Sequence, residues 1–152
     1  MRTTHIMIPF DRELLPGASN AINVCLRLQK SERITVITDV ETLEVAAALS
    51  SAAHTVGAEV SSFVLEDHST RPMTALPEIV IADLARSQVS IFAARAQSGE
   101  LPARVQLTHA VQRHRLRHGH MVNISKQIML DGMRADFAAM DRLSARLIER
   151  AR

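Results

Sequence analysis

The sequence predicts a three-layer α/β domain in which a mostly parallel sheet of about four to five strands is flanked by helices. Short, β-branched, apolar segments alternate along the chain with longer segments whose apolar residues recur at helical spacing. Only a few residues connect one segment to the next, as is usual in α/β domains. With 152 residues, 47% hydrophobic and 22% charged, the chain has the size and composition of one packed domain over residues 1–152.

The first βαβ unit is the clearest part of this pattern. Residues 33–39 (RITVITD) are apolar and β-branched over a short run, which is typical of a buried parallel strand. Asp39 then stands where a helix N-cap is expected, and apolar side chains follow at helical spacing as far as Gly57. Because glycine commonly ends helices, the helix should stop at Gly57, and residues 58–66 form the second predicted strand.

The same alternation continues to the end of the chain and also precedes the first strand. Further strands are predicted at residues 88–94 and 118–124. Further helices are predicted at residues 13–28 (broken near Pro16), 78–85, 102–116, 125–133 and 134–152. The single cysteine, Cys25, lies beside Ile22 and Leu26 on the apolar face of the first of these helices, so we expect a buried structural thiol rather than a nucleophile.

The composition argues against several classes of function. The chain has 4 Phe but neither Trp nor Tyr, so it lacks most of the rings on which single-stranded nucleic acids stack. No apolar run approaches the ~20 residues of a membrane-spanning helix, and the start MRTTHIMIPF is unlike a signal peptide. We therefore expect a cytoplasmic protein with no nucleic-acid or membrane partner. Residues 1–85 hold 6 Lys/Arg against 11 Asp/Glu and residues 86–152 hold 12 against 5, which leaves head-to-tail self-association open.

Ligands of an open α/β sheet bind beyond the carboxyl ends of its strands. The candidate residues there are Asp39, Glu66, Asp67, His68, Arg95 and the polar residues near Asn123. None belongs to a phosphate-binding loop or a nucleophile elbow, because GxGxxG, GxxxxGK[ST] and GxSxG are all absent from the chain. Spacing alone places no catalytic triad or carboxylate pair, and no cofactor is predicted.

Residues 104–120 form a second candidate site, because they contain four Arg and four His and no acid. His118 and His120 are two apart on a predicted strand, where two imidazoles on one face can share a metal. The nearby arginines would repel a cation, and no carboxylate or thiol occurs between Glu100 and Asp131, so no metal is predicted. The segment is otherwise a solvated helix face, or it binds a carboxylate, a phosphate or an acidic peptide. The candidates for such binding are Arg95, Arg104, His118 and His120.

Four stretches of the chain are distinctive in their order and spacing: the segment from GASNAINV to VSSFVLED, then RPMTALP, VSIFAARAQSGELPARVQL and RHGHMVNISKQIMLDGMRADFAAMDRLSARL. Together they span residues 17–147 and resemble the N-terminal domain of the aminopeptidase T family of metallo-aminopeptidases, with which iron-dependent dihydroxypyridine dioxygenases are grouped. The chain departs from the family at Asn123, Ile124 and Ser125, where a turn such as Gly-Ile-Thr is expected. The role of that loop in the resembled enzymes therefore does not carry over.

In the resembled enzymes the metal ligands lie in a second, catalytic domain, and no position of this chain corresponds to one of them. The resemblance thus implies a protein that is not an enzyme. We expect a peptide-binding accessory protein that guides a ribosomally made precursor peptide to its modifying enzymes in natural product biosynthesis. The peptide would add as a strand to an open sheet edge, and the chain would act as a homodimer or as a heterodimer with a related copy. Two alternatives stay open: an N-terminal fragment of a metal-dependent aminopeptidase or related dioxygenase, and a purely structural oligomerisation domain.

Overall fold

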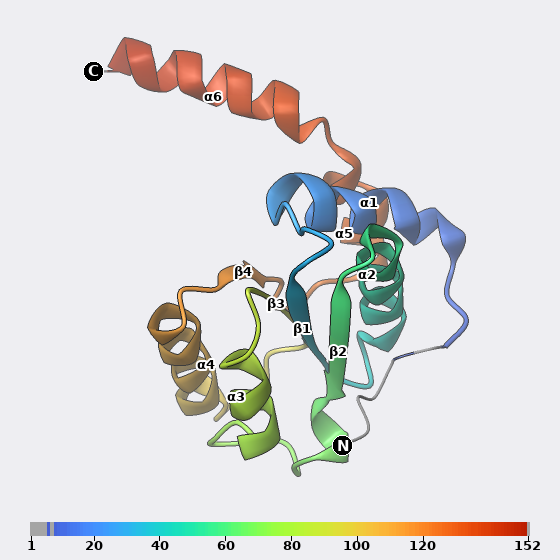
Figure 1. Ribbon diagram of the computed structural model, residues 1–152, viewed down its shortest axis with the longest axis vertical. Coiled ribbons are helices and arrows are strands. Elements are labelled where there is room, and N and C mark those ends of the chain that lie inside the picture. The colour runs from blue at the N-terminus through green and yellow to red at the C-terminus, as the bar shows by residue number, and fades with distance from the viewer. Residues whose placement is uncertain (1–5, 7, 152) are drawn as a thin grey trace.

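The computed structural model describes residue 6 and residues 8–151 of the chain (Figure 1). A four-stranded, all-parallel sheet lies at its centre, in the order β2-β1-β3-β4. The strands are β1 (Arg33–Thr38), β2 (Glu59–Val64), β3 (Val89–Ala93) and β4 (Arg117–His120). The sheet and the helices on its two faces confirm the predicted three-layer α/β architecture.

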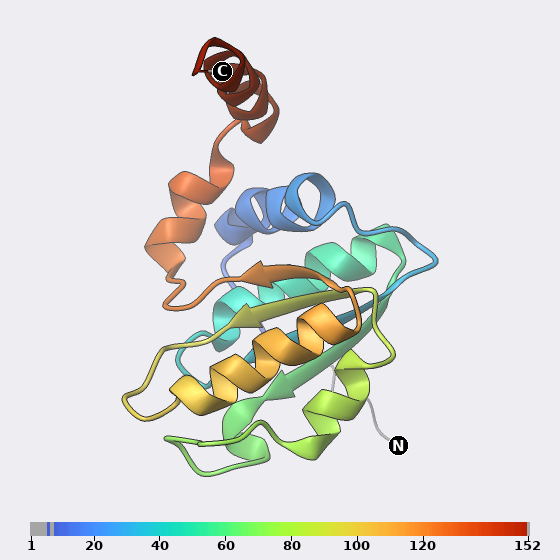
Figure 2. The same cartoon turned by 90° about the vertical axis from the view of Figure 1, so that its left-hand side faces the viewer.

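Helices cover both faces of the sheet, and one helix projects away from it (Figures 1 and 2). The first face carries α1 (Leu15–Ser19), η2 (Asn20–Cys25), α2 (Leu43–Val56) and α5 (Lys126–Leu130). The second face carries α3 (Glu78–Leu84) and α4 (Leu101–Arg113). Three short 3-10 turns, η1 (Arg12–Leu14), η3 (Leu65–Asp67) and η4 (Gly132–Arg134), connect these elements, and α6 (Phe137–Ala151) follows at the C-terminal side.

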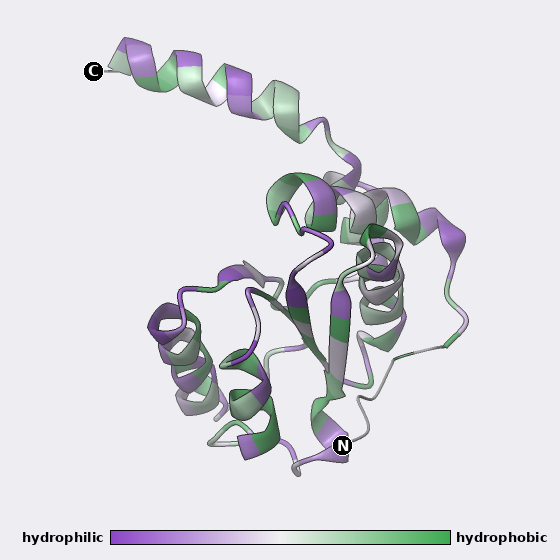
Figure 3. Ribbon diagram, viewed as in Figure 1, coloured by the Kyte–Doolittle hydropathy of each residue, from purple (hydrophilic) through white to green (hydrophobic). Residues whose placement is uncertain are grey.

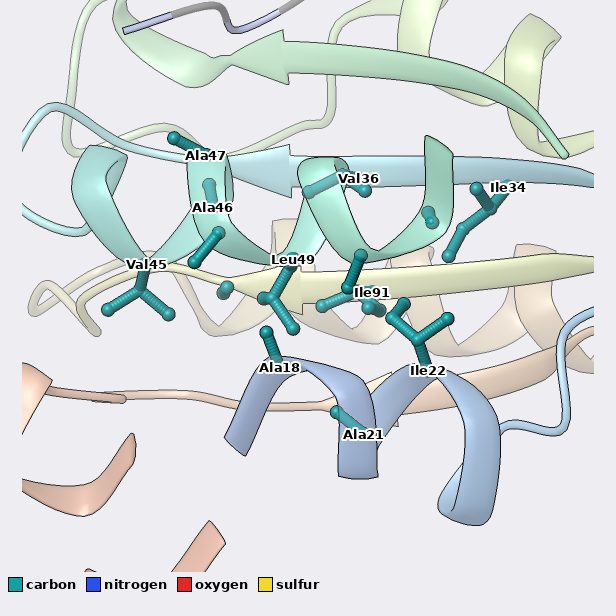
Figure 4. Close-up of a cluster of buried hydrophobic side chains, with 14 of the residues drawn as sticks. Ala18, Ala21, Ile22, Ile34, Val36, Val45, Ala46, Ala47, Leu49 and Ile91 are labelled. Carbon is teal, nitrogen blue, oxygen red and sulfur yellow. The ribbon is translucent and has the colours of Figure 1, made fainter. Parts of the chain in front are cut away.

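The alternation of side chains along the strands produces two separate apolar clusters. Val36 and Ile91 point from β1 and β3 to the first face, where they meet Leu49 of α2 and Ile22 of η2 (Figure 4). All four side chains are fully buried. Most of the buried residues of α2 are alanines, including Ala46, Ala48 and Ala53. Gly57 ends α2 in the left-handed region, at a φ of 86°, as the sequence predicts.

The second face combines an apolar cluster under α3 and α4 with a buried polar network. Asp83 of α3 accepts hydrogen bonds from the Nη2 of Arg33 at 2.5 Å and from the Oγ1 of Thr35 at 2.8 Å. The Oγ1 of Thr35 lies 2.7 Å from the Oγ of Ser87. These four residues are buried, and their mutual hydrogen bonds satisfy most of their polar groups, although the Nε of Arg33 has no partner among the described residues.

Two expectations for the first helical segment are wrong. Pro16 does not break the helix, because it occupies the first turn of α1, where its missing N–H costs no hydrogen bond. The helix instead widens into π-helical turns in η2, and the amide of Leu26 donates to the carbonyl of Ala21, five residues earlier, at 2.9 Å. These turns keep Ile22 and Leu26 inside and leave Cys25 exposed, whereas the sequence predicted a buried thiol.

Two boundaries also differ from the prediction. The N-cap of α2 is Thr42, three residues after the predicted Asp39, although Asp39 accepts a hydrogen bond from the Thr42 amide. The strand expected at 118–124 is β4, which already ends at His120. The chain turns there because the amide of Ile124 donates back to the carbonyl of Met121 and Asn123 adopts a φ of 58°.

The last helix, α6, contributes no buried residue. Its large apolar side chains Met140, Leu143, Leu147 and Ile148 are between 52% and 59% exposed. Figure 3 shows apolar and polar residues recurring along the helix where it extends beyond the body of the molecule. Within the described residues, no helix has both the length and the apolar character needed to cross a membrane.

Candidate functional site

The strand order places the switch point of the sheet between β1 and β3, where the loops that follow these strands diverge. Asp39 follows β1 and Arg95 comes shortly after β3, so two residues predicted to meet a ligand lie at this point. The space between them is occupied by the side chain of Arg71, which comes from the loop after β2 and is only 4% exposed. The position where this fold usually receives a ligand is thus filled by the chain itself.

Arg71 is held by three carboxylates and one carbonyl. Its Nε and Nη2 donate to the two oxygens of Glu100 at 2.7 Å and 2.6 Å, a bidentate pair. Its Nη1 donates to Asp39 at 2.7 Å and to Glu66 at 3.3 Å, and its Nη2 also donates to the carbonyl of Arg95 at 2.6 Å. Bidentate, charge-assisted bonds of this kind are among the strongest that side chains make.

The carboxylate of Asp39 is the centre of this cluster on the β1 side. It accepts hydrogen bonds from the amide of Arg95 at 2.6 Å and from the amide and hydroxyl of Thr42 at 2.9 Å and 2.7 Å. Burial by itself would raise the pKa of Asp39, but the bonds from Thr42, Arg71 and Arg95 outweigh it and hold the pKa below its ordinary value. Likewise, the bond from Arg71 outweighs burial and lowers the pKa of Glu100. Asp39 and Glu100 are therefore ionised at neutral pH and paired with Arg71.

The sequence identifies three of the five residues in this arrangement. Asp39, Glu66 and Arg95 were candidates, whereas Arg71 and Glu100 were not. The signal for Arg71 was its isolation, since it is the only Lys, Arg, Asp or Glu between Asp67 and Glu78. Of the other candidates, His68 packs its ring against Phe63 with centroids 5.7 Å apart, and Asn123 accepts a hydrogen bond from the amide of Ala96 at 2.8 Å.

The second candidate site lies on β4, which forms one edge of the sheet. The amides of Arg117, Met121 and Asn123 donate to carbonyls of β3 and its flanking residues. Since the peptide groups of a strand alternate in direction, those of His118 and His120 face the open side. No described strand pairs with β4 on that side, and its residues are exposed or half-buried, in contrast to the mostly buried β2 at the other edge.

The side chains of His118 and His120 lie together on the α4 face of this edge strand. The Nδ1 of His118 lies 2.8 Å from the Oγ of the buried Ser90, and its Nε2 lies 3.2 Å from the Nδ1 of His120. The two rings are tilted by 55°, with centroids 5.4 Å apart. The ring of His120 also stacks on the ring of Phe92, with centroids 5.8 Å apart. Ser90 therefore holds the ring of His118 in place, and Phe92 holds the ring of His120.

Electrostatics keep these imidazoles neutral near pH 7. Burial and, to a smaller extent, the neighbouring His120 together lower the pKa of His118 to about 4. Burial and the positive charge of Arg104 lower the pKa of His120. Arg104 comes from α4, and its buried Nε has no hydrogen-bond partner within the described part of the chain.

The structure thus brings together three of the four residues that the sequence proposed for peptide or anion binding. His118, His120 and Arg104 share one corner of the β4 edge. Arg95 does not join them, because its guanidinium pairs with the exposed Glu41 at 3.3 Å beside the switch point. Arg95 lies apart from the other three residues because it follows β3 and faces the end of β1.

No family model and no curated protein matches this chain. Among solved structures, the chain is similar to 2,5-dihydroxypyridine dioxygenase from Pseudomonas putida KT2440, with a TM-score of 0.46 and 14% sequence identity. The similar region covers 67% of this chain and 33% of the dioxygenase chain. This neighbour belongs to the dioxygenase side of the expected resemblance, and no aminopeptidase is matched.

Proposed function

We propose that the chain is a non-catalytic, peptide-binding accessory protein that receives an acidic peptide as an added strand on β4. The observation that carries this proposal is the open edge of β4, with Arg104 beside it. Strand addition draws its affinity from backbone hydrogen bonds and its selectivity from side-chain contacts. Both elements are present at this corner of the molecule.

The backbone of β4 supplies the first element. The outward-facing N–H and C=O groups of His118 and His120 are free of β3 and are positioned to pair with an incoming strand. The strand is short, so the pairing would cover a few residues of the peptide. Because both histidines present their side chains to the α4 face, alternate residues of the bound peptide would lie beside them.

The charge of Arg104 supplies the second element. It is the cation that acts on His120, so its positive charge lies beside the open edge of β4. A Glu or Asp side chain on the α4 face of an added strand would meet this guanidinium, whereas a Lys side chain would be repelled. Neutral imidazoles add no competing charge. Acidic peptides are therefore the preferred ligand class.

The proposal also covers the family relation and the biological role of the protein. A relation to the N-terminal domain of the aminopeptidase T family, and a role in guiding a ribosomally made precursor peptide to modifying enzymes, are suggested by the sequence resemblance. A homodimer, or a heterodimer with a related copy, accords with the exposed apolar residues of α6. Each of these statements is open to direct tests of binding and association.

The test is a titration with labelled ten-residue peptides that alternate Val with Glu, Gln or Lys, followed by fluorescence anisotropy. The Glu peptide should bind more tightly than the Gln peptide, and the Lys peptide least. In ¹⁵N NMR spectra, the shifted amides should centre on His118 and His120. The variant His120→Pro, which removes an outward N–H without removing a bond to β3, should weaken binding.

The matched charge control is on the same helix. Arg104→Gln and Arg113→Gln remove one charge each, but Arg113 is exposed at the far end of α4. Only Arg104→Gln should weaken binding of the Glu peptide. An equal loss of affinity in both variants would show that only the net charge of the chain matters. NMR shifts centred on β2 would show that the peptide binds at the other edge of the sheet. Absence of binding by all three peptides contradicts the proposal.

A second candidate, a structural oligomerisation domain, is favoured by α6. Four large apolar side chains on a helix with no buried residue are unusual for an isolated molecule. Light scattering of the wild-type chain and of Leu147→Arg distinguishes the two functions. Loss of a dimer in this variant, with no peptide binding by either form, would favour the structural role.

A further inference from the structure

We propose that His118 and His120 form a two-imidazole binding site for a divalent transition-metal ion such as Zn²⁺ or Cu²⁺. The inference is independent of peptide binding, because it uses the imidazole side chains, whereas strand addition uses the backbone of the same strand. Imidazole nitrogen is a preferred ligand of both ions. The proposal rests on the short distance between a ring nitrogen of His118 and a ring nitrogen of His120.

The distance between these nitrogens matches the separation that one metal ion imposes on two ligands. With metal–nitrogen bonds of about 2.0–2.1 Å, two nitrogens stand about 2.9 Å apart at a square-planar angle and about 3.3 Å apart at a tetrahedral angle. The Nε2 of His118 lies 3.2 Å from the Nδ1 of His120. The spacing of the two nitrogens thus suits a shared ion, which would replace the hydrogen bond between the two rings.

The surroundings of the pair suit this role. The Nδ1 of His118 lies 2.8 Å from the Oγ of Ser90, so a proton on Nδ1 can be donated to the hydroxyl while the Nε2 lone pair faces the metal. Metal-bound histidines usually donate their second N–H in this way. Phe92 supports the ring of His120 from below.

The sequence argued against a metal because several arginines lie close to the two histidines along the chain. The fold places most of these arginines away from the histidine pair. Arg117 points to the other face of β4, where it pairs with Glu32 and donates to the carbonyl of Leu26. Arg113 and Arg115 lie at the opposite end of the strand, before β4 begins. Arg104 is the cation that acts on His120. The repulsion on a bound ion therefore comes chiefly from one side chain.

The chain supplies two ligands, and the site is otherwise open. No group of three or more His, Cys, Asp or Glu side chains is arranged around an ion anywhere in the described ranges 6 and 8–151. The remaining coordination positions would be filled by water or by a donor group from a partner. Such a site binds more weakly than a closed structural site and exchanges its ion readily.

The test is calorimetric titration of the full chain with ZnCl₂, and separately with CuCl₂, in a non-chelating buffer at pH 7.5. We expect saturable binding of one ion, lost in His118→Gln and in His120→Gln and retained in His109→Gln, which changes an exposed histidine on α4. His120 is itself exposed, so His120→Gln keeps the fold, and circular dichroism verifies this. Substoichiometric Cu²⁺ should broaden NMR signals around β4 first.

Two further variants move the affinity in opposite directions. Ser90→Ala removes the hydroxyl behind His118 and should weaken Zn²⁺ binding about tenfold. Arg104→Gln removes the nearby positive charge and should tighten Zn²⁺ binding several-fold, although the same change weakens binding of an acidic peptide. Absence of binding heat, heat that survives both His118→Gln and His120→Gln, or broadening centred away from β4 would overturn the inference. None of these results bears on the peptide titration.

Discussion

Arg71 and Glu100 meet side by side, with the Nε and Nη2 of the arginine donating to the two carboxylate oxygens at 2.7 Å and 2.6 Å. Both side chains are only 4% exposed. The pair lies where ligands of this kind of sheet usually bind, and Asp39 contacts the same guanidinium. Its energetic weight can be measured directly.

Removing Arg71 should be strongly destabilising. The change Arg71→Ala leaves the buried carboxylates of Asp39 and Glu100 without their common partner, which costs about 3–5 kcal/mol of unfolding free energy. Urea unfolding measures the loss. Arg95→Gln is the control, because its pair with Glu41 is exposed and should be worth at most about 1 kcal/mol. Similar losses in the two variants would contradict the assigned role of Arg71.

A close backbone contact makes Gly17 costly to replace with any larger residue. A Cβ at Gly17 would lie 2.5 Å from the carbonyl oxygen of Met129 and 3.0 Å from the Cβ of Met133. Although alanine favours helices, Gly17→Ala should lower the unfolding free energy by about 1–3 kcal/mol, because α1 and α5 must move apart. Gly132→Ala is the matched control, since nothing lies within 4 Å of its added Cβ. Thermal unfolding of both variants checks the prediction.

The unfolding free energy should fall on mild acidification because of His118. Its pKa is about 4 in the folded chain, against an ordinary value of 6.5. Between these values the unfolded chain binds the proton and the folded chain does not, so stability falls as the pH drops from about 6.5 to about 4. The lowered pKa values of Asp39 and Glu100 add a further loss of stability that sets in near their ordinary values of 3.8 and 4.5, so it overlaps the acidic end of this range.

The variant His118→Gln isolates this effect. Urea unfolding at intervals between pH 7 and pH 4 should show a shallower loss for His118→Gln than for the wild-type chain. His109→Gln should keep the wild-type slope. An unchanged slope in His118→Gln would show that the imidazole is not held neutral by its surroundings.

The apolar residues of α6 should contribute little to the stability of a single chain. Leu147 is 59% exposed, whereas Leu49 of α2 is fully buried. Leu49→Ala should cost about 2–5 kcal/mol, and Leu147→Ala should change the unfolding free energy by no more than about 0.5 kcal/mol at low protein concentration. A large, concentration-dependent effect of Leu147→Ala would instead place α6 in an interface between chains.

The layers of the fold were predictable from the sequence because parallel strands are buried on both faces and read as short apolar runs. Residues 33–39, 58–66 and 88–94 each correspond to an observed strand within one or two residues. The shortened β4 was not predictable in the same way. Its end depends on the positive φ of Asn123, a conformation that the apolar pattern does not indicate.

The sites were only partly predictable, for a related reason. The pairing of His118 with His120 follows from their spacing of two on a strand, which is local information. The approach of Arg104 to that pair and of Arg71 to Glu100 depends on how distant segments pack. The π-helical turns that expose Cys25 also arise from packing, since the sequence pattern fits a regular helix.

Arg71, Asp39 and Glu100 form one ion-paired unit rather than three separate residues. Losing Arg71 leaves the buried carboxylates of Asp39 and Glu100 without their common partner, while replacing all three residues with apolar residues of similar volume can be tolerated. Among homologues that keep this strand order, the three positions should therefore change together or not at all. An arginine at the position of Arg71 would then mark those relatives in which the switch point is closed by the chain itself.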